Sequence, residues 1–244
     1  MTLASDARTV QAAPAPGPAG RRRAGGKVRR MPREVRERQM LDAAVEVFAR
    51  RGYRAASMDE IAELAGVSKP LVYLYLQSKE ELFGACIRRE AHALMEAVTA
   101  AVEPDAPADA RLWNGLRAFF AHTADHPDGW ALLSCQARTH GEPFTPVVAE
   151  LRQQIVDVVT RLIAATCEDA GRAGAPADHE VSGLAHALVG AAESLAGWAN
   201  SPTGAQPSAK ETAATLMDVA WVGLENLVSG RRWSPTAPPP EDAP

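Results

Sequence analysis

The 244-residue sequence predicts an all-α fold of about nine helices. Three observations lead to this prediction. Apolar residues recur at helical spacing through most of the chain, capping residues and glycines mark helix ends, and no stretch alternates as a β-strand does. The two ends are different: residues 1–30 are rich in Pro, Gly, Ala and Arg, and residues 233–244 are rich in Pro. We expect both ends to be disordered.

Composition excludes several classes of protein. No apolar run approaches the ~20 residues of a membrane-spanning helix, and the N-terminus has no apolar signal segment. Cys86, Cys135 and Cys167 are widely spaced and fit reduced structural thiols, so a cytoplasmic location without a membrane is expected. Residues 1–90 hold 17 basic and 11 acidic side chains, whereas residues 91–244 hold 9 and 19. This asymmetry indicates that only the N-terminal part approaches a polyanion.

Three short helices are predicted before a longer one. Gly52 is a C-terminal stop for the first helix, and Ser57 to Glu60 form a capping box for the second. Ser68 can cap the third, with Pro70 in its first turn. A further capping box at Ser78 to Glu81 opens the longer helix. The expected bounds are about Arg33–Arg51, Ser57–Ala65, Ser68–Leu74 and Lys79–Val102.

The pattern stays helical beyond that point. Pro107 begins a helix that is interrupted at His126, and a short helix is expected over Trp130–Arg138. A long helix starts at Thr145 and is broken at Gly171. The last two helices are expected at about His179–Asn200 and Ala209–Gly230, the latter after a capping box at Ser208 to Glu211.

The second and third helices have the layout of a helix-turn-helix that reads DNA. The second helix of such a pair lies in the major groove. Val67, Val72 and Leu76 have the spacing to pack inward. Lys and Tyr side chains on the free face can contact phosphates, and Pro and Leu can meet a thymine methyl. The residues left on that face are Lys69, Pro70, Leu71, Tyr73 and Tyr75.

The basic N-terminal arm allows two interpretations. Its arginines, which lie just before the first helix, could enter the minor groove or follow phosphates. They could equally belong to a solvated tail without DNA contact. The sequence leaves both open.

Four segments together resemble the DNA-binding domain of the TetR family of bacterial transcriptional regulators: LDAA (41–44), FARRGY (48–53), SMDEIAELAGVSKP (57–70) and VYLYLQSKEEL (72–82). The resemblance implies a helix-turn-helix domain over residues 31–83. It also implies a ligand-responsive regulator, with repression as the expected mode, that binds a palindromic operator in double-stranded DNA as a homodimer. Pro70 stands where a small residue is common, and Leu76 where Phe is usual. The implied DNA contacts are Ser57, Ser68, Lys69, Pro70, Leu71, Tyr73, Tyr75 and Lys79.

The same resemblance implies that residues 84–232 bind a small-molecule effector and dimerise through the last two long helices. Aromatic side chains and one Cys on the middle helices are candidates for the effector pocket, although each could equally be plain core. Together they favour an apolar or amphipathic effector. The candidates are Trp113, Phe119, Phe120, Trp130, Cys135, Phe144 and Trp198.

Little in the chain suggests other chemistry. His122 and His126 are four residues apart and could form a metal pair, but no third ligand is evident, so we expect no metal. No catalytic arrangement or cofactor motif is persuasive, which argues against an enzyme. The alternative to a ligand-responsive regulator is an architectural protein that coats DNA without an effector, which the basic arm would favour. A footprint separates them, because a regulator protects one short palindrome.

Overall fold

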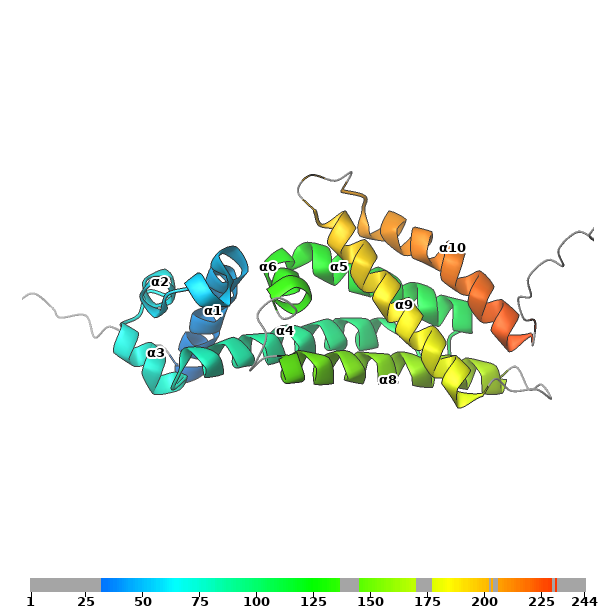
Figure 1. Cartoon of the computed structure of the whole chain (residues 1–244), viewed down its shortest axis with the longest axis horizontal. Helices are drawn as coiled ribbons and strands as arrows, with labels where there is room; N and C mark the ends of the chain where they lie inside the picture. The colour runs from blue at the N-terminus through cyan, green and yellow to red at the C-terminus, as the bar shows by residue number, and fades with distance from the viewer. Residues whose placement is uncertain are drawn as a thin grey trace, which may run out of the picture. The chain divides into compact units, whose positions relative to one another are not determined.

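The computed structural model describes residues 32–136, 145–169, 177–201, 203, 206–229 and 231. These residues form nine α-helices and one π-helix without a strand, which confirms the predicted all-α fold (Figure 1). The predicted disordered arm and tail lie outside the described residues. The elements are α1 (Arg33–Ala55), α2 (Met58–Leu64), α3 (Lys69–Tyr75), α4 (Lys79–Ala101), α5 (Ala108–Asp125), α6 (Pro127–Ala131), η1 (Leu132–Gln136), α8 (Thr145–Asp169), α9 (Asp178–Ala199) and α10 (Ala209–Val228).

The regular part of α1 breaks at Gly52, as the sequence predicts, although the element continues to Ala55. Gly52 has φ 74° and ψ 160°, so the regular helix breaks there in the left-handed region that favours glycine. One more turn follows, and Ala56 N donates to Gly52 O at 3.1 Å. The glycine therefore kinks the helix and redirects the chain toward α2.

Serine side chains cap three of the four helices for which the sequence predicts such a cap, and Ser68 before α3 is the exception. Ser78 Oγ accepts from Glu81 N at 3.0 Å, and Ser208 and Glu211 form both bonds of a capping box. Ser57 Oγ accepts from Asp59 N at 3.2 Å. Glu60, which was expected to complete that box, instead accepts from Arg51 of α1 at 3.4 Å.

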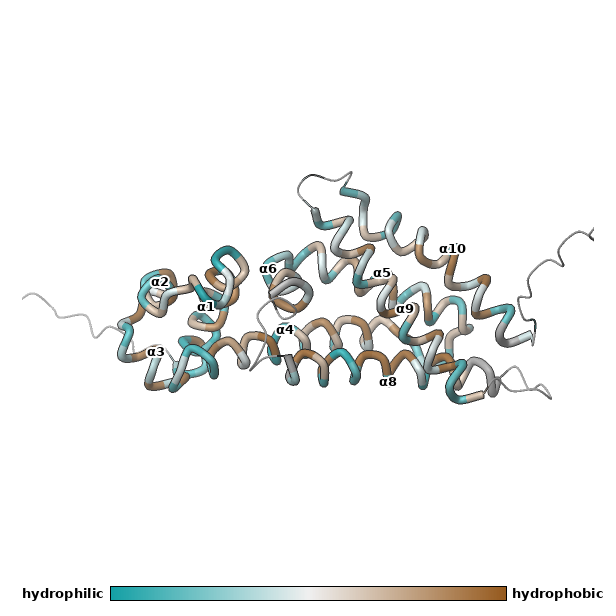
Figure 2. Tube along the Cα trace, in the orientation of Figure 1, coloured by the Kyte–Doolittle hydropathy of each residue, from teal (hydrophilic) through white to brown (hydrophobic). Residues whose placement is uncertain are grey.

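The apolar residues form three core clusters. The first cluster joins the four helices α1, α2, α3 and α4. It contains an aromatic group in which the Phe83 ring lies 4.9 Å from the Phe48 ring and 5.0 Å from the Tyr53 ring. A second joins α4, α5, α6, α9 and α10, and a third joins α8, α9 and α10. The hydrophobic stretches that α8 brings to the last cluster are visible in Figure 2.

The segment after α5 differs from the predicted Trp130–Arg138 helix. Helix α6 begins earlier, at Pro127, whose fixed φ suits a first helical position, and it continues as the π-helix η1. Leu132 of η1 is fully buried in the cluster that holds α1 to α4. Its neighbour Leu133 lines the cavity described below. One turn of the chain thus contacts both the helix-turn-helix core and the cavity.

Candidate functional site

The surface of α3 presents most of the predicted DNA-contact residues. Gly66, with φ 66°, makes the turn between α2 and α3. Val72 and Leu76 are buried and hold α3 against the core, as the spacing predicts. This packing leaves Ser68, Lys69, Pro70 and Tyr73 exposed, while Leu71 and Tyr75 are half-buried.

Two side chains of α3 alter the predicted surface. The Arg33 guanidinium lies 5.1 Å from the centre of the Tyr75 ring, so Tyr75 is also engaged with α1. Leu74 is 75% exposed and was not among the predicted contacts. It lies one turn after Leu71, so the helical period of the free face was the signal for it. Both leucines can offer apolar contact to a thymine methyl.

Lys69 is paired across the turn. Its Nζ lies 2.9 Å from Asp59 Oδ2 on α2, and both side chains are largely exposed. The hydrogen bond to Asp59, and then its charge, raise the pKa of Lys69. Ser57 is occupied by its own cap, whereas the Ser68 side chain makes no capping bond.

Lys79 fastens the start of α4 to the end of α1. Its Nζ donates to Arg54 O at 3.2 Å and lies 4.9 Å from the centre of the Tyr53 ring. Tyr53 OH donates to Glu80 at 2.7 Å. Burial lowers the pKa of Lys79, although the charge of Glu80 acts in the opposite direction. Burial, and then the hydrogen bond to Glu80 and its charge, raise the pKa of Tyr53 to about 12. These contacts set the angle between α1 and α4 behind the α3 surface.

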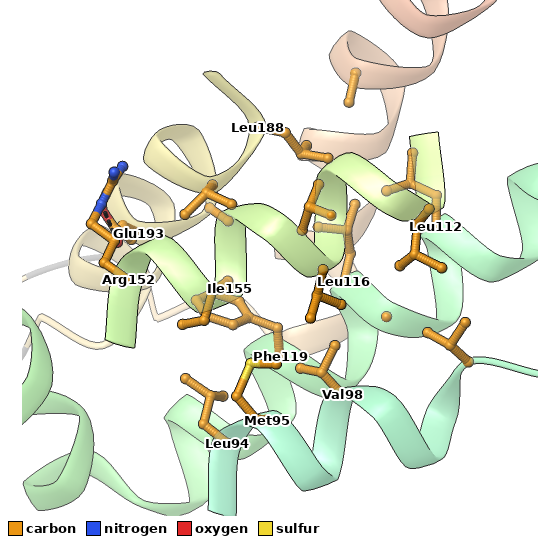
Figure 3. Close-up of a pocket in the computed structure, with 18 of the residues that line it drawn as sticks. Leu94, Met95, Val98, Leu112, Leu116, Phe119, Arg152, Ile155, Leu188 and Glu193 are labelled. Atoms are coloured by element: carbon orange, nitrogen blue, oxygen red, sulfur yellow. Dashed lines mark hydrogen bonds and ion pairs between the residues drawn. The ribbon is translucent and has the colours of Figure 1, made fainter. Parts of the chain in front are cut away.

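An apolar cavity of about 180 Å³ lies between α4, α5, α8 and α9 (Figure 3). Along α8 its wall runs from Val148 to Ile163, about 22 Å at the rise of an α-helix. The cavity is therefore long and narrow. Labelled wall residues in Figure 3 include Leu94, Met95, Val98, Leu112, Leu116, Phe119, Ile155 and Leu188.

Few polar groups reach this cavity. Arg152 of α8 and Glu193 of α9 pair at 3.0 Å at one end of the wall, away from Leu112 in Figure 3. Arg111 and Ser134 also belong to the lining. The arrangement suits a slender apolar body with a polar group at an end.

The predicted pocket residues separate into three groups. Phe119 and Trp130 line the cavity, with their rings 5.6 Å apart at 86°. Trp113 and Phe120 pack in the second core cluster, and Trp198 is 49% exposed on α9. The Cys135 side chain and Phe144 lie outside the described residues. Most of the lining is aliphatic, and its helical spacing gave no signal to separate it from ordinary core.

The two histidines on α5 and at its end lie face to face. The rings of His122 and His126 are 4.3 Å apart and nearly parallel. Burial, and then the neighbouring His126, lower the pKa of His122, which favours neutral imidazole there. Across the described ranges, no group of three or more His, Cys, Asp or Glu side chains could hold a metal ion.

Helices α9 and α10 carry three large apolar side chains that are exposed in the described structure. Trp198 is 49% exposed, Val219 is 73% exposed and Val222 is 56% exposed. Exposed large apolar side chains are candidates for an interface. None of the helices in the described part of the chain has the length and apolarity needed to cross a membrane.

Two family models match the chain. "Bacterial regulatory proteins, tetR family" matches residues 40–86, and "Tetracyclin repressor-like, C-terminal domain" matches residues 108–223. A TetR-like transcriptional regulator from Rhodococcus sp. RHA1 has a solved structure that is 36% identical. That match has a TM-score of 0.67 and covers 80% of this chain and 99% of that one.

Two curated relatives match over shorter stretches. The transcriptional activator FasR of Mycolicibacterium smegmatis is 42% identical over 116 residues, which is 48% of this chain and 52% of FasR. The transcriptional repressor SCO4008 of Streptomyces coelicolor is 31% identical over 120 residues, 49% of this chain and 59% of its own length. The chain thus spans only about half the length of these relatives. All of these relatives are named regulators, in agreement with the prediction of a regulator rather than an enzyme.

Proposed function

The chain belongs to the tetR family of bacterial regulatory proteins, and from that premise we propose that it is a ligand-responsive repressor. As a homodimer it binds a palindromic operator through α3, and a small apolar or amphipathic effector in the cavity releases it. One observation carries this proposal. Helix α4 supplies Phe83 and Ile87 to the helix-turn-helix core and, further along, Leu94 and Val98 to the cavity wall.

The exposed face of α9 and α10 supports the homodimer. Trp198, Val219 and Val222 would be covered if the same face of a second copy packed against them. Two-fold symmetry then presents two α3 helices to one duplex. Half-sites about 34 Å apart, one turn of DNA, would match such a pair.

The cavity supports the class of effector. A wall of aliphatic and aromatic side chains favours an apolar body, and its elongated form favours a slender one. The Arg152–Glu193 pair at one end can meet a polar group. The indole N–H of Trp130 is a second polar feature, because it is buried in the described structure without a hydrogen-bond acceptor.

The shared helix supports the coupling between the two sites. An effector that wedges α4 away from α8 would displace the part of α4 that packs on α1, in the core cluster that also holds Val72 of α3. Release requires the effector to bind the DNA-free conformation more tightly than the DNA-bound one. To shift the ratio of DNA-bound to DNA-free conformation from 99:1 to 1:99, the difference in binding free energy must be about 5.5 kcal/mol. A second route runs through η1, where Leu132 packs on the helix-turn-helix core and Leu133 faces the cavity.

The DNA half of the proposal is tested by selecting genomic fragments with the purified full chain and footprinting those recovered. One short palindrome overlapping a promoter is expected. Protection upstream of the promoter would indicate activation, the mode named for FasR, and continuous protection would indicate the architectural alternative. Failure to select any fragment would contradict the proposal.

The effector half is tested with a variant that fills the cavity. Gly115→Leu places a side chain in the lining, where a Cβ meets only Val102 and Val98 at 3.4 and 3.9 Å. Gly183→Leu is the matched control, because a Cβ there meets nothing within 4 Å and Gly183 is exposed on α9. We expect Gly115→Leu to keep operator binding but lose the fluorescence of anilinonaphthalene sulfonate bound in the cavity, while the control keeps both. Equal fluorescence from the two variants would contradict the cavity as the effector site.

A further inference from the structure

Together, helices α2 and α3, which would face DNA, carry more acidic than basic side chains. Helix α2 carries Asp59, Glu60 and Glu63, whereas α3, whose sequence is KPLVYLY, carries Lys69 as its basic residue. Phosphate contact dominates non-specific DNA affinity. A recognition surface with more carboxylates than ammonium groups is therefore poorly suited to bind an arbitrary duplex.

The geometry strengthens this effect at Lys69. The 2.9 Å contact with Asp59 Oδ2 neutralises the ammonium group at the first position of α3. Both partners are exposed, so the pair contributes little to folding. Glu60 does not pair with Lys69; its Oε1 forms ion pairs with Arg50 and Arg51 of α1 instead.

We propose that Asp59 limits the affinity for DNA, because it forms an ion pair with the Lys69 ammonium group that a DNA phosphate must displace. The inference rests on the proposed DNA contact of Lys69. On a random duplex the ammonium group gains one phosphate but leaves Asp59 uncompensated, so little is gained. On an operator, the apolar and tyrosine contacts of α3 hold the helix in register. The exchange of Asp59 for a phosphate as the partner of Lys69 then adds to these contacts and is favourable.

The salt dependence of binding reports this exchange directly. Each phosphate neutralised by a free cation adds about −0.9 to the slope of log K against log salt. When Lys69 binds a phosphate, DNA releases a cation. In the wild type, Asp59 takes up a cation at the same time, and this uptake offsets the release. Asp59→Asn removes the offset, while the Asn oxygen can still accept from Lys69 and preserve the turn.

The experiment measures binding of the full chain to its selected genomic operator and to a scrambled duplex of equal length, from 50 to 200 mM salt. Asp59→Asn should steepen the slope by about 0.9. Over this range the variant then loses about 3.5-fold more affinity than the wild type. At 50 mM salt it should bind the operator several-fold more tightly, because the wild type must break the ion pair in that complex, and the gain on the scrambled duplex should be no larger.

Two further variants isolate the pair. Glu63→Gln makes the same charge change on the exposed surface of α2 without touching Lys69 and should shift the slope by less than half as much. In a Lys69→Gln background, Asp59→Asn should have no more effect than Glu63→Gln. The proposal is overturned if Asp59→Asn matches Glu63→Gln, if its effect persists without Lys69, or if the scrambled duplex gains more than the operator. Absence of DNA binding by the wild type would instead overturn the proposed function.

Discussion

Gly129 should be among the least replaceable residues of α6. It lies on α6 where the buried Glu90 of α4 approaches the backbone. A Cβ at this position would overlap Glu90 Oε2 and lie 3.1 Å from Glu90 Cδ. Glu90 has little freedom to yield, because Arg89 donates to its Oε1 at 2.7 and 2.9 Å and also binds Asp42 of α1 at 2.7 Å. Gly129→Ala therefore strains a network that links α6, α4 and α1.

The change in unfolding free energy caused by Gly129→Ala is the sum of a stabilising and a destabilising contribution. Replacing Gly by Ala inside a helix stabilises by up to about 1 kcal/mol. Overpacking costs about 1–3 kcal/mol, and breaking a largely buried ion pair adds to it. We expect a net loss of about 2 kcal/mol, equivalent to a Tm lower by about 4–8 °C in a chain of this size.

The assay is thermal unfolding followed by circular dichroism at a fixed protomer concentration, with Gly115→Ala as the matched control. That substitution adds a Cβ at ordinary contact distance from Val102, so it should raise stability by up to about 1 kcal/mol. Removing the obstructing carboxylate tests the cause: in a Glu90→Ala background, Gly129→Ala should cost nothing. The reasoning is refuted if Gly129→Ala behaves like Gly115→Ala, or if its cost is unchanged without Glu90.

Three further predictions concern other parts of the chain. Val219→Glu should convert the proposed homodimer to a monomer in light scattering without lowering helix content, because it charges an exposed apolar position on α10; a dimer that persists would point to another interface. Ser208→Ala removes the two hydrogen bonds of its side chain to Glu211 and should destabilise by about 1 kcal/mol in urea unfolding; an unchanged midpoint would mean that the cap is dispensable. Burial raises the pKa of Cys86 from its usual 9.0 to about 12, so the stability due to the neutral thiol is complete below pH 9 and lost as pH rises toward 12. Cys86→Ala should flatten that decline in unfolding free energy, and parallel pH profiles would contradict the assignment.

The helix-turn-helix could be predicted from sequence because its signals are local. Gly52, Gly66 and the capping serines each act within a few residues, and the structure places helix ends beside them. The pair between Asp59 and Lys69 could not be predicted, because it depends on the angle that the turn sets between two helices. Local rules say which residues begin a helix and leave open which ones meet across a turn.

The cavity was only partly predictable for a related reason. Aromatic residues drew attention as candidates, yet the lining is mainly aliphatic, and a leucine at helical spacing looks the same beside a cavity as inside a packed core. Phe119 and Trp130 line the cavity, whereas Phe120 faces the adjacent core. Which face of α5 remains unfilled depends on how α8 and α9 pack, and that is a property of several helices together.

The position of Leu132 indicates that the helix-turn-helix domain is not structurally independent of the rest of the chain. The core that supports α3 is completed by Cys86 and Ile87 of α4 and by Leu132 of η1, about 50 residues beyond the helix-turn-helix. A fragment cut after Phe83 would leave these contacts unfilled, so its α3 would lack a firm support. A chimera that joins this DNA-reading segment to the body of a relative would have to carry α6 and η1 with it. Exchange of DNA specificity between relatives should therefore proceed through the exposed face of α3, which can change without disturbing the shared core.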